Sequence, residues 1–350
     1  MLKALWALAF IALLAGCGRF VDVISYETSI KRVTVADRRL PTYDTRPVDD
    51  ALESRLHSAG FTGFLHLNDK GQVFEWYRTG FSKTRPVNVK SVSKSLFSAL
   101  VGQSATEVDA PIPSFAGCDV PPDLAPLTLA QLLNMTAGFA FTENVSSGVY
   151  AAPGWGCAAM ALPAEARSGE RFNYNTLQYY LAGLHLSETL GGDIAHLMQD
   201  DVFAPIGIAL DGWVVSPDGD VFTGSEMRLH PRDMLRFGHV MVQDGVWNTR
   251  QVLSPGWIRQ TRQPVRQDTG RANVTYGWGW WQTRLAGQAV QFAEGYGGQA
   301  IVLAPTTGEV FVFTAPTGGL TSGRTHTARV DSLLAIVADQ LARPSALSDF

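Results

Sequence analysis

The sequence has few charged residues for its length. Of 350 residues, 28 are lysine or arginine and 32 are aspartate or glutamate, which gives a formal net charge of −4. No basic run stands out, so the electrostatic footprint of a nucleic-acid-binding protein is missing. Charged residues make up 17% and hydrophobic residues 46%, a balance typical of a globular chain with a sizeable core.

Patterns that bind metals or phosphate groups are also missing. The seven histidines show no metal-ligand spacing, no glycine-rich phosphate loop occurs, and no Gly-x-Ser-x-Gly segment predicts an α/β-hydrolase. We therefore expect no metal and no organic cofactor. The sequence also contains no internal repeat, no low-complexity tract and no second long apolar span.

The long apolar run lies at the start of the chain. Lys3 precedes an uncharged stretch over residues 5–15, a pattern typical of a secretory signal and too short to span a bilayer stably. Residues 14–17, Leu-Ala-Gly-Cys, resemble a bacterial lipobox, in which the cysteine is lipidated. We interpret residues 1–17 as a lipoprotein signal with lipidation at Cys17; the alternative is an ordinary signal with an incidental cysteine.

Gly18 follows this cysteine where inner-membrane lipoproteins carry aspartate, and this favours the outer membrane. We expect an exported protein, attached to the membrane through its N-terminal lipid and lying on the periplasmic face. Export implies an oxidising compartment. The two remaining cysteines, Cys118 and Cys157, form either one disulfide or two free thiols, because the sequence does not give the distance between them.

Strand patterns occur near both ends of the chain. Residues 61–67 and 73–77 flank the turn signal Asn-Asp-Lys-Gly, and residues 300–303 and 310–313 flank Thr-Thr-Gly. Each pair predicts a hairpin. An aromatic segment, Tyr-Gly-Trp-Gly-Trp-Trp at 276–281, predicts a further strand, in which alternation would place Trp278 and Trp280 on one face and Trp281 on the other.

Helical patterns fill the middle of the chain and its end. Residues 127–135, 177–190 and 327–341 carry apolar side chains at helical spacing. Strands at both ends with helices between them predict an α/β fold, an antiparallel sheet flanked by helices with an inserted, mostly helical domain at about 105–220.

The domain bounds follow from these patterns. We expect an N-terminal arm over 18–50 and one main domain over 51–345. The loop at 139–157 is long for a compact domain, and such loops are often functional. Trp155 in this loop either lines a cleft or packs in the core.

The segment Ser-Val-Ser-Lys at 91–94 opens a helical pattern. Positions i and i+3 of a helix share a face, so Ser91 and Lys94 are expected to lie together. A serine hydroxyl is a weak nucleophile until a base accepts its proton, and a neutral lysine can be that base. We therefore predict Ser91 as nucleophile and Lys94 as base; the alternative is an ordinary surface helix.

Two later elements complete a candidate site. Tyr174 stands just before the helix predicted from residue 177, where its phenol could move a proton. The segment Gly-Tyr-Gly-Gly-Gln at 295–299 leads into a strand, and its glycines permit close approach of the backbone to a ligand. An oxyanion hole needs backbone N–H donors, and we predict those of Ser91 and Tyr296.

These three elements, in this order, resemble the penicillin-recognising serine hydrolases, the β-lactamases, penicillin-binding proteins and related esterases and amidases. Segments 127–139, 230–238 and 276–281 are similar to further parts of that family, and the likeness runs from about residue 60 to 340. The nearest branch resembles class C enzymes close to the 6-aminohexanoate-oligomer hydrolases. The resemblance implies Ser91 as the acylated nucleophile, Lys94 as base and Tyr174 as the tyrosine of the Tyr-x-Asn motif.

The sequence departs from the family at two positions. Thr176 stands where the Tyr-x-Asn motif has asparagine, so substrate recognition there would fall to Thr176, with Gly295 and Gly297 of the third element. That third element has no lysine or histidine, the cation with which family β-lactamases hold the drug's carboxylate. Efficient β-lactam hydrolysis is therefore not expected.

The sequence thus predicts a hydrolase that cleaves an ester or amide bond of a small molecule or peptide through an acyl-enzyme at Ser91. One alternative is a cell-wall D-amino-acid peptidase. Another is a non-catalytic envelope binding protein on the same fold, which the two departures keep open. The oligomeric state and the substrate's identity do not follow from the sequence.

Overall fold

The computed structural model describes residues 30–34, 41–140, 149–150, 153–317 and 322–343. The predicted signal at 1–17, with its lipidation site Cys17, lies outside the described residues, as does much of the predicted arm at 18–50. No helix of the described ranges combines the length and hydropathy needed to cross a membrane.

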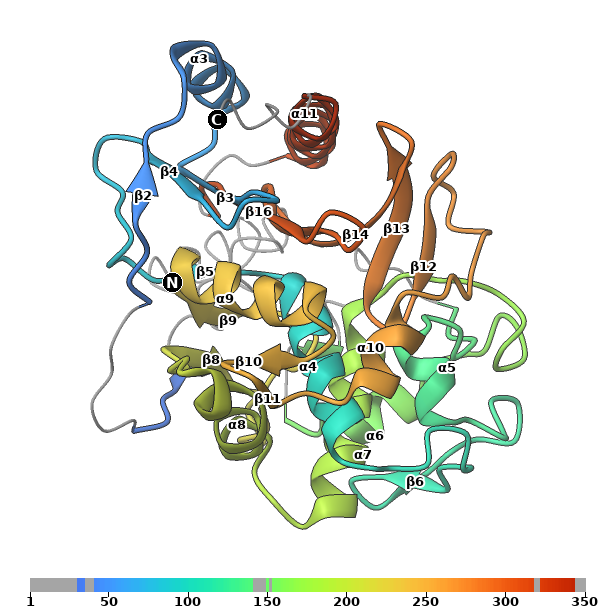
Figure 1. Ribbon diagram of the computed structural model, residues 1–350. Coiled ribbons are helices and arrows are strands. Elements are labelled where there is room, and N and C mark those ends of the chain that lie inside the picture. Colours follow the sequence, from blue (N-terminus) through green and yellow to red (C-terminus); the bar gives the residue numbers. More distant parts are fainter. Residues whose placement is uncertain (1–29, 35–40, 141–148, 151–152, 318–321, 344–350) are drawn as a thin grey trace, which may run out of the picture.

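The main sheet has eight strands (Figure 1). Neighbouring strands are antiparallel except for β2 and β4, which run parallel. In sheet order the strands are β12 (Thr275–Gly277), β13 (Trp280–Leu285), β14 (Gln288–Gly295), β15 (Gln299–Ala304), β16 (Glu309–Thr314), β3 (Gly63–Leu67), β4 (Val73–Tyr77) and β2 (Thr45–Arg46).

The two ends of the chain meet in the centre of this sheet. β16 pairs with β3, so that Phe313 lies opposite Phe64, and both strands are buried along their whole length. Burial on both faces requires cover from two layers of helices. α3 (Asp50–Ala59) and α11 (Gly323–Leu341) lie on one side of the sheet, and α4 (Val92–Gln103) and α9 (Pro231–Val242) on the other (Figure 1). The predicted α/β fold is confirmed.

The described residues between 105 and 211 form several helices and no strand of the main sheet. Their bounds as a separate domain stay a prediction. The elements are β6 (Ser114–Phe115), β7 (Cys118–Asp119), α5 (Leu129–Leu133), α6 (Trp155–Met160), α7 (Thr176–Leu190), α8 (Ile194–Leu197), a π-helix (Met198–Phe203) and a 3₁₀ helix (Ala204–Ile206).

The remaining elements connect these layers. A four-stranded sheet has the order β1-β8-β9-β5, and β10 pairs with β11. The bounds are β1 (Ile30–Lys31), β5 (Val87–Asn88), β8 (Gly212–Val214), β9 (Met227–Leu229), β10 (Val246–Trp247), β11 (Arg250–Gln251) and α10 (Pro255–Thr261).

The aromatic segment at 276–281 is a hairpin and not one continuous strand. Trp278 and Gly279 form the turn between β12 and β13, with φ of 56° and 90°. The predicted alternation across one strand was therefore wrong at Trp278, because a two-residue turn with positive φ interrupts it. Trp278, Trp280 and Trp281 are all buried.

Trp155 is a core residue. Its indole is fully buried at the start of α6, edge-on to the rings of Tyr180 and Phe222. Of the two places that the sequence left open for Trp155, the structure has the core, because α6 turns the side chain toward Tyr180 and Phe222.

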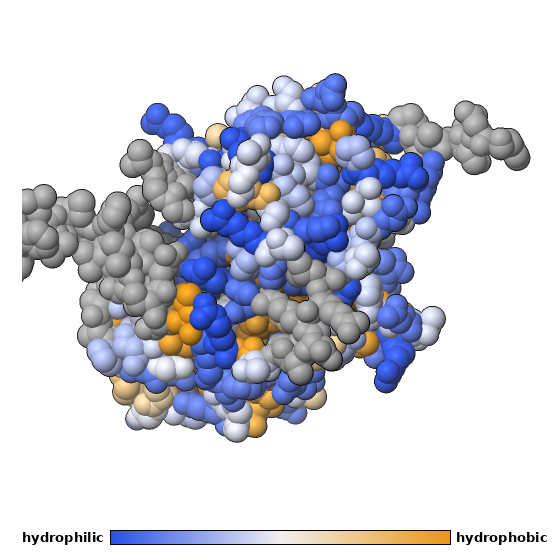
Figure 2. Space-filling view, turned by 90° about the vertical axis from the view of Figure 1, so that its left-hand side faces the viewer, coloured by the Kyte–Doolittle hydropathy of each residue, from blue (hydrophilic) through white to orange (hydrophobic). Residues whose placement is uncertain are grey.

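The surface is mainly polar. The face shown in Figure 2 is largely hydrophilic, with small, separate hydrophobic patches. Among the described residues, the exposed large hydrophobic side chains are Val246, Val265 and Tyr296. Scattered single apolar residues are normal on a globular surface, so they define no docking face.

A disulfide joins Cys118 in β7 to Cys157 in α6, with their Cα atoms 5.2 Å apart. Of the two arrangements left open by the sequence, the structure has the bonded one. The bond closes a loop with a sequence separation of 39 residues. It ties the small β6–β7 hairpin to the helices.

Removing this bond is expected to destabilise the fold. For a closed loop of this length, chain entropy predicts a loss of about 4 kcal/mol in the free energy of unfolding. Denaturant unfolding of the Cys118→Ser, Cys157→Ser double variant beside the oxidised wild type measures that loss. Equal unfolding free energies for the two proteins would contradict the prediction.

Candidate active site

Ser91 stands at the N-cap position of α4, immediately before Val92. The preceding residue, Lys90, has a φ of 51°, which is uncommon outside glycine and often marks a functional turn. Two contacts hold this conformation: the N–H of Lys90 donates to Asn88 Oδ1 at 3.0 Å, and Lys90 Nζ lies 2.9 Å from a carboxylate oxygen of Glu226. The backbone at Ser91 is thereby fixed.

Lys94 lies one turn further along α4, as the spacing predicts. Its Nζ is 2.9 Å from Ser91 Oγ, and its side chain is 1% exposed. Nζ also donates to the carbonyl oxygen of Gly224 at 2.7 Å and lies 3.1 Å from Thr176 Oγ1. A serine hydroxyl becomes a strong nucleophile when a neighbouring base accepts its proton. The pair therefore has the arrangement of a nucleophile and its base.

Thr176 lies at the start of α7, next to Lys94. Asn175 caps α7 by accepting the N–H of Gln178, so Thr176 is the first residue of the helix and is buried. Its hydroxyl contacts Lys94 Nζ. Thr176 thus lies beside the predicted base, and its predicted part in substrate binding stays a prediction.

The contact between the Thr176 hydroxyl and Lys94 Nζ predicts the effect of replacing Thr176 with valine, which has nearly the same shape. Thr176→Val removes the hydroxyl beside Lys94 Nζ and is expected to lower kcat for p-nitrophenyl acetate about tenfold, the value of one hydrogen bond to a charged or polarised group. Thr176→Ser restores a hydroxyl and serves as the control. Steady-state kinetics measure kcat for each variant. Thermal unfolding verifies that each variant is folded. Unchanged kcat in a folded Thr176→Val would contradict it.

Tyr174 faces the same lysine. Lys94 Nζ lies 5.0 Å from the centroid of the Tyr174 ring. That ring stacks on Trp281, centroid to centroid 5.3 Å, and meets Tyr276 edge-on. The structure thus brings Tyr174 to the side of the predicted catalytic pair, where a phenol can exchange protons with neighbouring groups.

Two other buried phenols lie close by, since the Tyr179 ring is 5.9 Å from Lys94 Nζ and the Tyr276 ring is 5.9 Å from that of Tyr174. Tyr179 donates its hydroxyl to the carbonyl oxygen of Leu133 at 2.9 Å, and burial raises its pKa well above the usual value. Burial also raises the pKa of Tyr276 well above the usual value. Both side chains remain protonated at ordinary pH, so neither can act as a base.

The glycine segment packs against the chain that leads into Ser91. A Cβ atom at Gly295 would lie 2.2 Å from the carbonyl oxygen of Val89, so no other residue fits there. Tyr296 follows directly and is 39% exposed. This contact brings the predicted oxyanion segment to the start of α4, next to the backbone of Ser91.

Residues 297–299 of the glycine segment contact the chain after β16 and helix α11. Gly297 has a φ of 97°, and a Cβ atom there would lie 2.9 Å from the carbonyl oxygen of Pro316. Arg329 of α11 donates to the carbonyl oxygen of Gly297 at 2.8 Å. The Gln299 side chain bonds both the carbonyl and the N–H of Ala315. The turn between β14 and β15 is therefore held in one conformation.

An ion pair fixes the chain before Tyr174. Asp268 accepts the N–H of Phe172 at 3.2 Å and pairs with Arg266 at 2.6 Å. The Arg266 guanidinium lowers the pKa of Asp268 to about 2. The carboxylate is thus ionised at ordinary pH, and it ties the 263–274 loop to the segment that carries the tyrosine.

Sequence reasoning missed Gly224 and Arg329. Gly224 contributes a carbonyl oxygen to Lys94, and every residue type has one, so its identity gave no signal. Arg329 lies on a helix face more than thirty residues after the glycine segment that it supports. Within the described ranges, no three His, Cys, Asp or Glu side chains gather as metal ligands.

Comparisons with known proteins concern the family and the fold. The family model described as Beta-lactamase matches residues 49–335. The chain is similar to a Bacillus anthracis protein named as a putative 6-aminohexanoate-dimer hydrolase, at TM-score 0.74 and 16% identity over 90% of this chain and 92% of the other.

Two further solved structures share the fold. A penicillin-binding protein from Bacillus halodurans matches at TM-score 0.62 and 16% identity, over 82% of this chain and 100% of that one. A D-stereospecific amidohydrolase from a Streptomyces species matches at 0.58 and 16%, over 76% and 94%. At these identities the likeness shows the fold alone.

Proposed function

This chain belongs to the beta-lactamase family, and on that premise we propose that it is a serine hydrolase acting through an acyl-enzyme at Ser91. The resemblance predicted from the sequence is confirmed at the level of the family. The observation that carries the proposal is the 2.9 Å contact between Ser91 Oγ and the buried Lys94 Nζ.

The proposed reaction has two stages. The neutral amine of Lys94 accepts the proton of Ser91 Oγ as that oxygen attacks the substrate's carbonyl carbon. Backbone N–H groups of Ser91 and Tyr296 stabilise the oxyanion. The leaving alcohol or amine receives a proton by way of Tyr174 and departs. Water then attacks the acyl group, giving the acid and restoring the serine.

The substrate is proposed to be an ester or amide outside the β-lactam class. The segment at 295–299 carries no cation to hold a β-lactam's carboxylate. Two similar structures are named for amide hydrolysis, the D-stereospecific amidohydrolase and the 6-aminohexanoate-dimer hydrolase. The similarity to the D-stereospecific enzyme favours a D-amino-acid peptidase as the second candidate.

A substrate panel tests these alternatives. The panel pairs p-nitrophenyl acetate with linear amides, with peptides ending in D-alanine, and with the β-lactam nitrocefin. We expect turnover of the acetate ester or a linear amide, and slow or no turnover of nitrocefin. Release of D-alanine as the fastest reaction would select the peptidase. If the protein hydrolysed none of these substrates but bound peptidoglycan, it would be the non-catalytic binding protein.

We further propose that the enzyme acts while attached to the periplasmic face of the outer membrane through a lipid on Cys17. The lipobox-like residues 14–17 support this. Globomycin, which blocks cleavage of lipoprotein signals, should cause the precursor to accumulate. An unchanged mature protein under globomycin would contradict lipidation at Cys17.

A further inference from the structure

The aromatic stack beside Lys94 continues beyond Tyr174. The Tyr174 ring stacks on Trp281, with 5.3 Å between the ring centroids and an angle of 26° between the ring planes. Trp281 is buried, and the rings of Tyr276 and Phe172 meet its indole edge-on. Stacked rings have a preferred separation and offset, so the orientation of the Tyr174 phenol depends on the position of this indole.

An arginine also lies over this indole. The guanidinium carbon of Arg271 is 4.7 Å from the centroid of the Trp281 ring, a distance at which a cation is attracted to an aromatic face. Arg271 belongs to the chain between α10 and β12, and Asp268 of the same stretch accepts the N–H of Phe172. This stretch therefore contacts the surroundings of Tyr174 twice, at the chain before the tyrosine and at the ring on which it stacks.

An ion pair fixes the position of Arg271. Its Nη1 donates to Glu294 Oε1 at 2.8 Å, and the Glu294 side chain is largely buried. The guanidinium carbon also lies 5.5 Å from the centroid of the Phe292 ring. Both partners belong to β14, in which Phe292 pairs with Trp281 of β13. A planar guanidinium that bonds a carboxylate and packs on two rings is held in one orientation.

We propose that Arg271 is a positioning residue for Tyr174, which it orients through the Trp281 indole. The inference rests on the proposed function, in which the proton taken by Lys94 reaches the leaving oxygen or nitrogen by way of Tyr174. A proton donor acts only within hydrogen-bond reach of the atom that it protonates. Arg271 thereby sets how well the enzyme cleaves bonds whose leaving group has to be protonated.

The leaving group separates the orientation of Tyr174 from general damage to the site. p-Nitrophenolate is a stable anion and departs without a proton, whereas a benzyl alcohol has to be protonated as it departs. A misplaced phenol should therefore slow the cleavage of p-nitrobenzyl acetate and have little effect on p-nitrophenyl acetate. A general loss of structure would slow both esters alike.

These two esters, which share one acyl group, test the proposal. The value of kcat/KM covers acylation, the stage in which the leaving group departs. The quantity compared is the ratio of kcat/KM for p-nitrobenzyl acetate to that for p-nitrophenyl acetate, in the full chain and in its Arg271→Gln variant. Glutamine removes the cation from the Trp281 ring, so we expect the ratio to fall about fivefold, the value of one cation–π contact.

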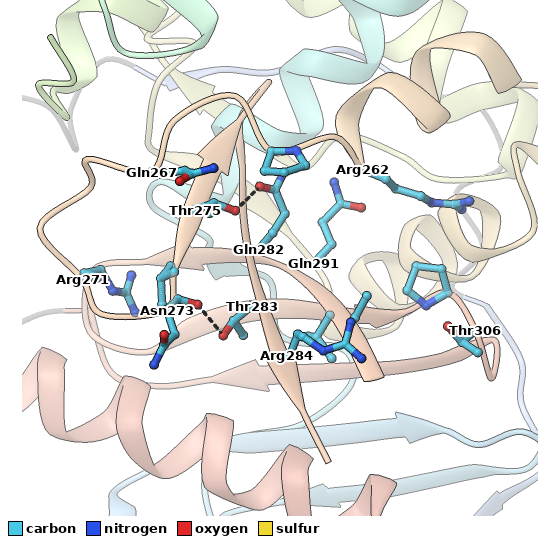
Figure 3. Close-up of a pocket in the computed structure, with 15 residues that line it drawn as sticks. Arg262, Gln267, Arg271, Asn273, Thr275, Gln282, Thr283, Arg284, Gln291 and Thr306 are labelled. Carbon is cyan, nitrogen blue, oxygen red and sulfur yellow. Dashed lines mark hydrogen bonds between the residues drawn. The ribbon is translucent and has the colours of Figure 1, made fainter. Parts of the chain in front are cut away.

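Arg284→Gln is the matched control. Arg284 and Arg271 line one pocket at the edge of the main sheet, but Arg284 is exposed on β13 and donates to the carbonyl oxygen of Gly287 (Figure 3). This variant should keep the wild-type ratio, and thermal unfolding verifies that both variants are folded. An unchanged ratio in Arg271→Gln, or an equal fall in Arg284→Gln, would overturn the proposal.

A double-variant cycle tests whether the effect of Arg271 passes through Tyr174. Tyr174→Phe keeps the ring and removes the hydroxyl, so it should lower the same ratio. If Arg271 acts by orienting that hydroxyl, Arg271→Gln should lower the ratio no further in the Tyr174→Phe protein. Losses that multiply in the double variant would show that Arg271 acts elsewhere, and the proposal would be rejected.

A measurement without turnover separates this inference from the proposed reaction. 3-Fluorotyrosine at position 174 gives a ¹⁹F resonance that reports the surroundings of that ring. Arg271→Gln should shift this resonance, and Arg284→Gln should leave it in place. The shift in a protein that hydrolyses no ester would sustain the positioning of the ring and reject the hydrolase. An unchanged resonance in Arg271→Gln would reject the positioning, whatever the activity.

Discussion

Replacing Ser91 with alanine is expected to lower kcat for p-nitrophenyl acetate by about 10⁴-fold or more, because the reaction then has no nucleophile. Ser91 Oγ is the atom 2.9 Å from Lys94 Nζ, and its position at the N-cap of α4 is fixed by the Lys90 turn. KM should change little, because the Ser91 hydroxyl acts in the chemical step and the residues that bind the substrate are unchanged.

Ser104→Ala is the matched control for this experiment. Ser104 ends the same helix, where its hydroxyl donates to the carbonyl oxygen of Val101. It should retain full activity. A Ser91→Ala protein that hydrolyses the ester at a rate similar to the wild type would show that another group performs the attack.

Replacing Lys94 with methionine is expected to lower kcat by about 10³-fold, within the usual range for removal of a general base. Methionine fills a similar volume in the buried site without an amine. The fold should survive, because the change removes a buried polar group together with the cost of burying it.

Two further variants sharpen the test of the base. Lys94→Arg keeps the charge but cannot accept a proton at ordinary pH, so it should be as inactive as Lys94→Met. Lys70→Met removes an exposed lysine from the β3–β4 turn and should leave kcat unchanged. If Lys94→Met retained the wild-type pH profile and kcat, Lys94 would not be the base.

The catalytic pair could be predicted from the sequence because its geometry is local. Ser91 and Lys94 are three positions apart, and helical spacing alone brings their side chains together. Hairpin turns gave the pairings of β3 with β4 and of β15 with β16 for the same reason. Local rules constrain such contacts without knowledge of the rest of the fold.

Contacts between distant segments were harder to predict. The contact between Thr176 and Lys94 was not predicted, because nothing in the neighbouring sequence shows that α7 turns this hydroxyl toward Lys94. The turn at Trp278 was missed because tryptophan rarely adopts a positive φ. The Cys118–Cys157 bond depends on how two separate elements pack, and the distance between them is not encoded locally.

A pocket lined by three arginines could not be predicted for the same reason. Arg262, Arg271 and Arg284 are spread over a loop and a strand, and no spacing between them suggests a common site. Only the packing of the 262–275 loop against β13 and β14 brings their guanidinium groups around one space (Figure 3).

Intact-mass spectrometry after incubation with a fluorophosphonate tests the central claim most directly. The chain lacking residues 1–17 would be compared with its Ser91→Ala variant. An activated serine attacks phosphorus and expels fluoride, so the account predicts one adduct on the wild type and none on the variant. No adduct on either protein, or an adduct on both, would contradict the assignment of Ser91 as an activated nucleophile.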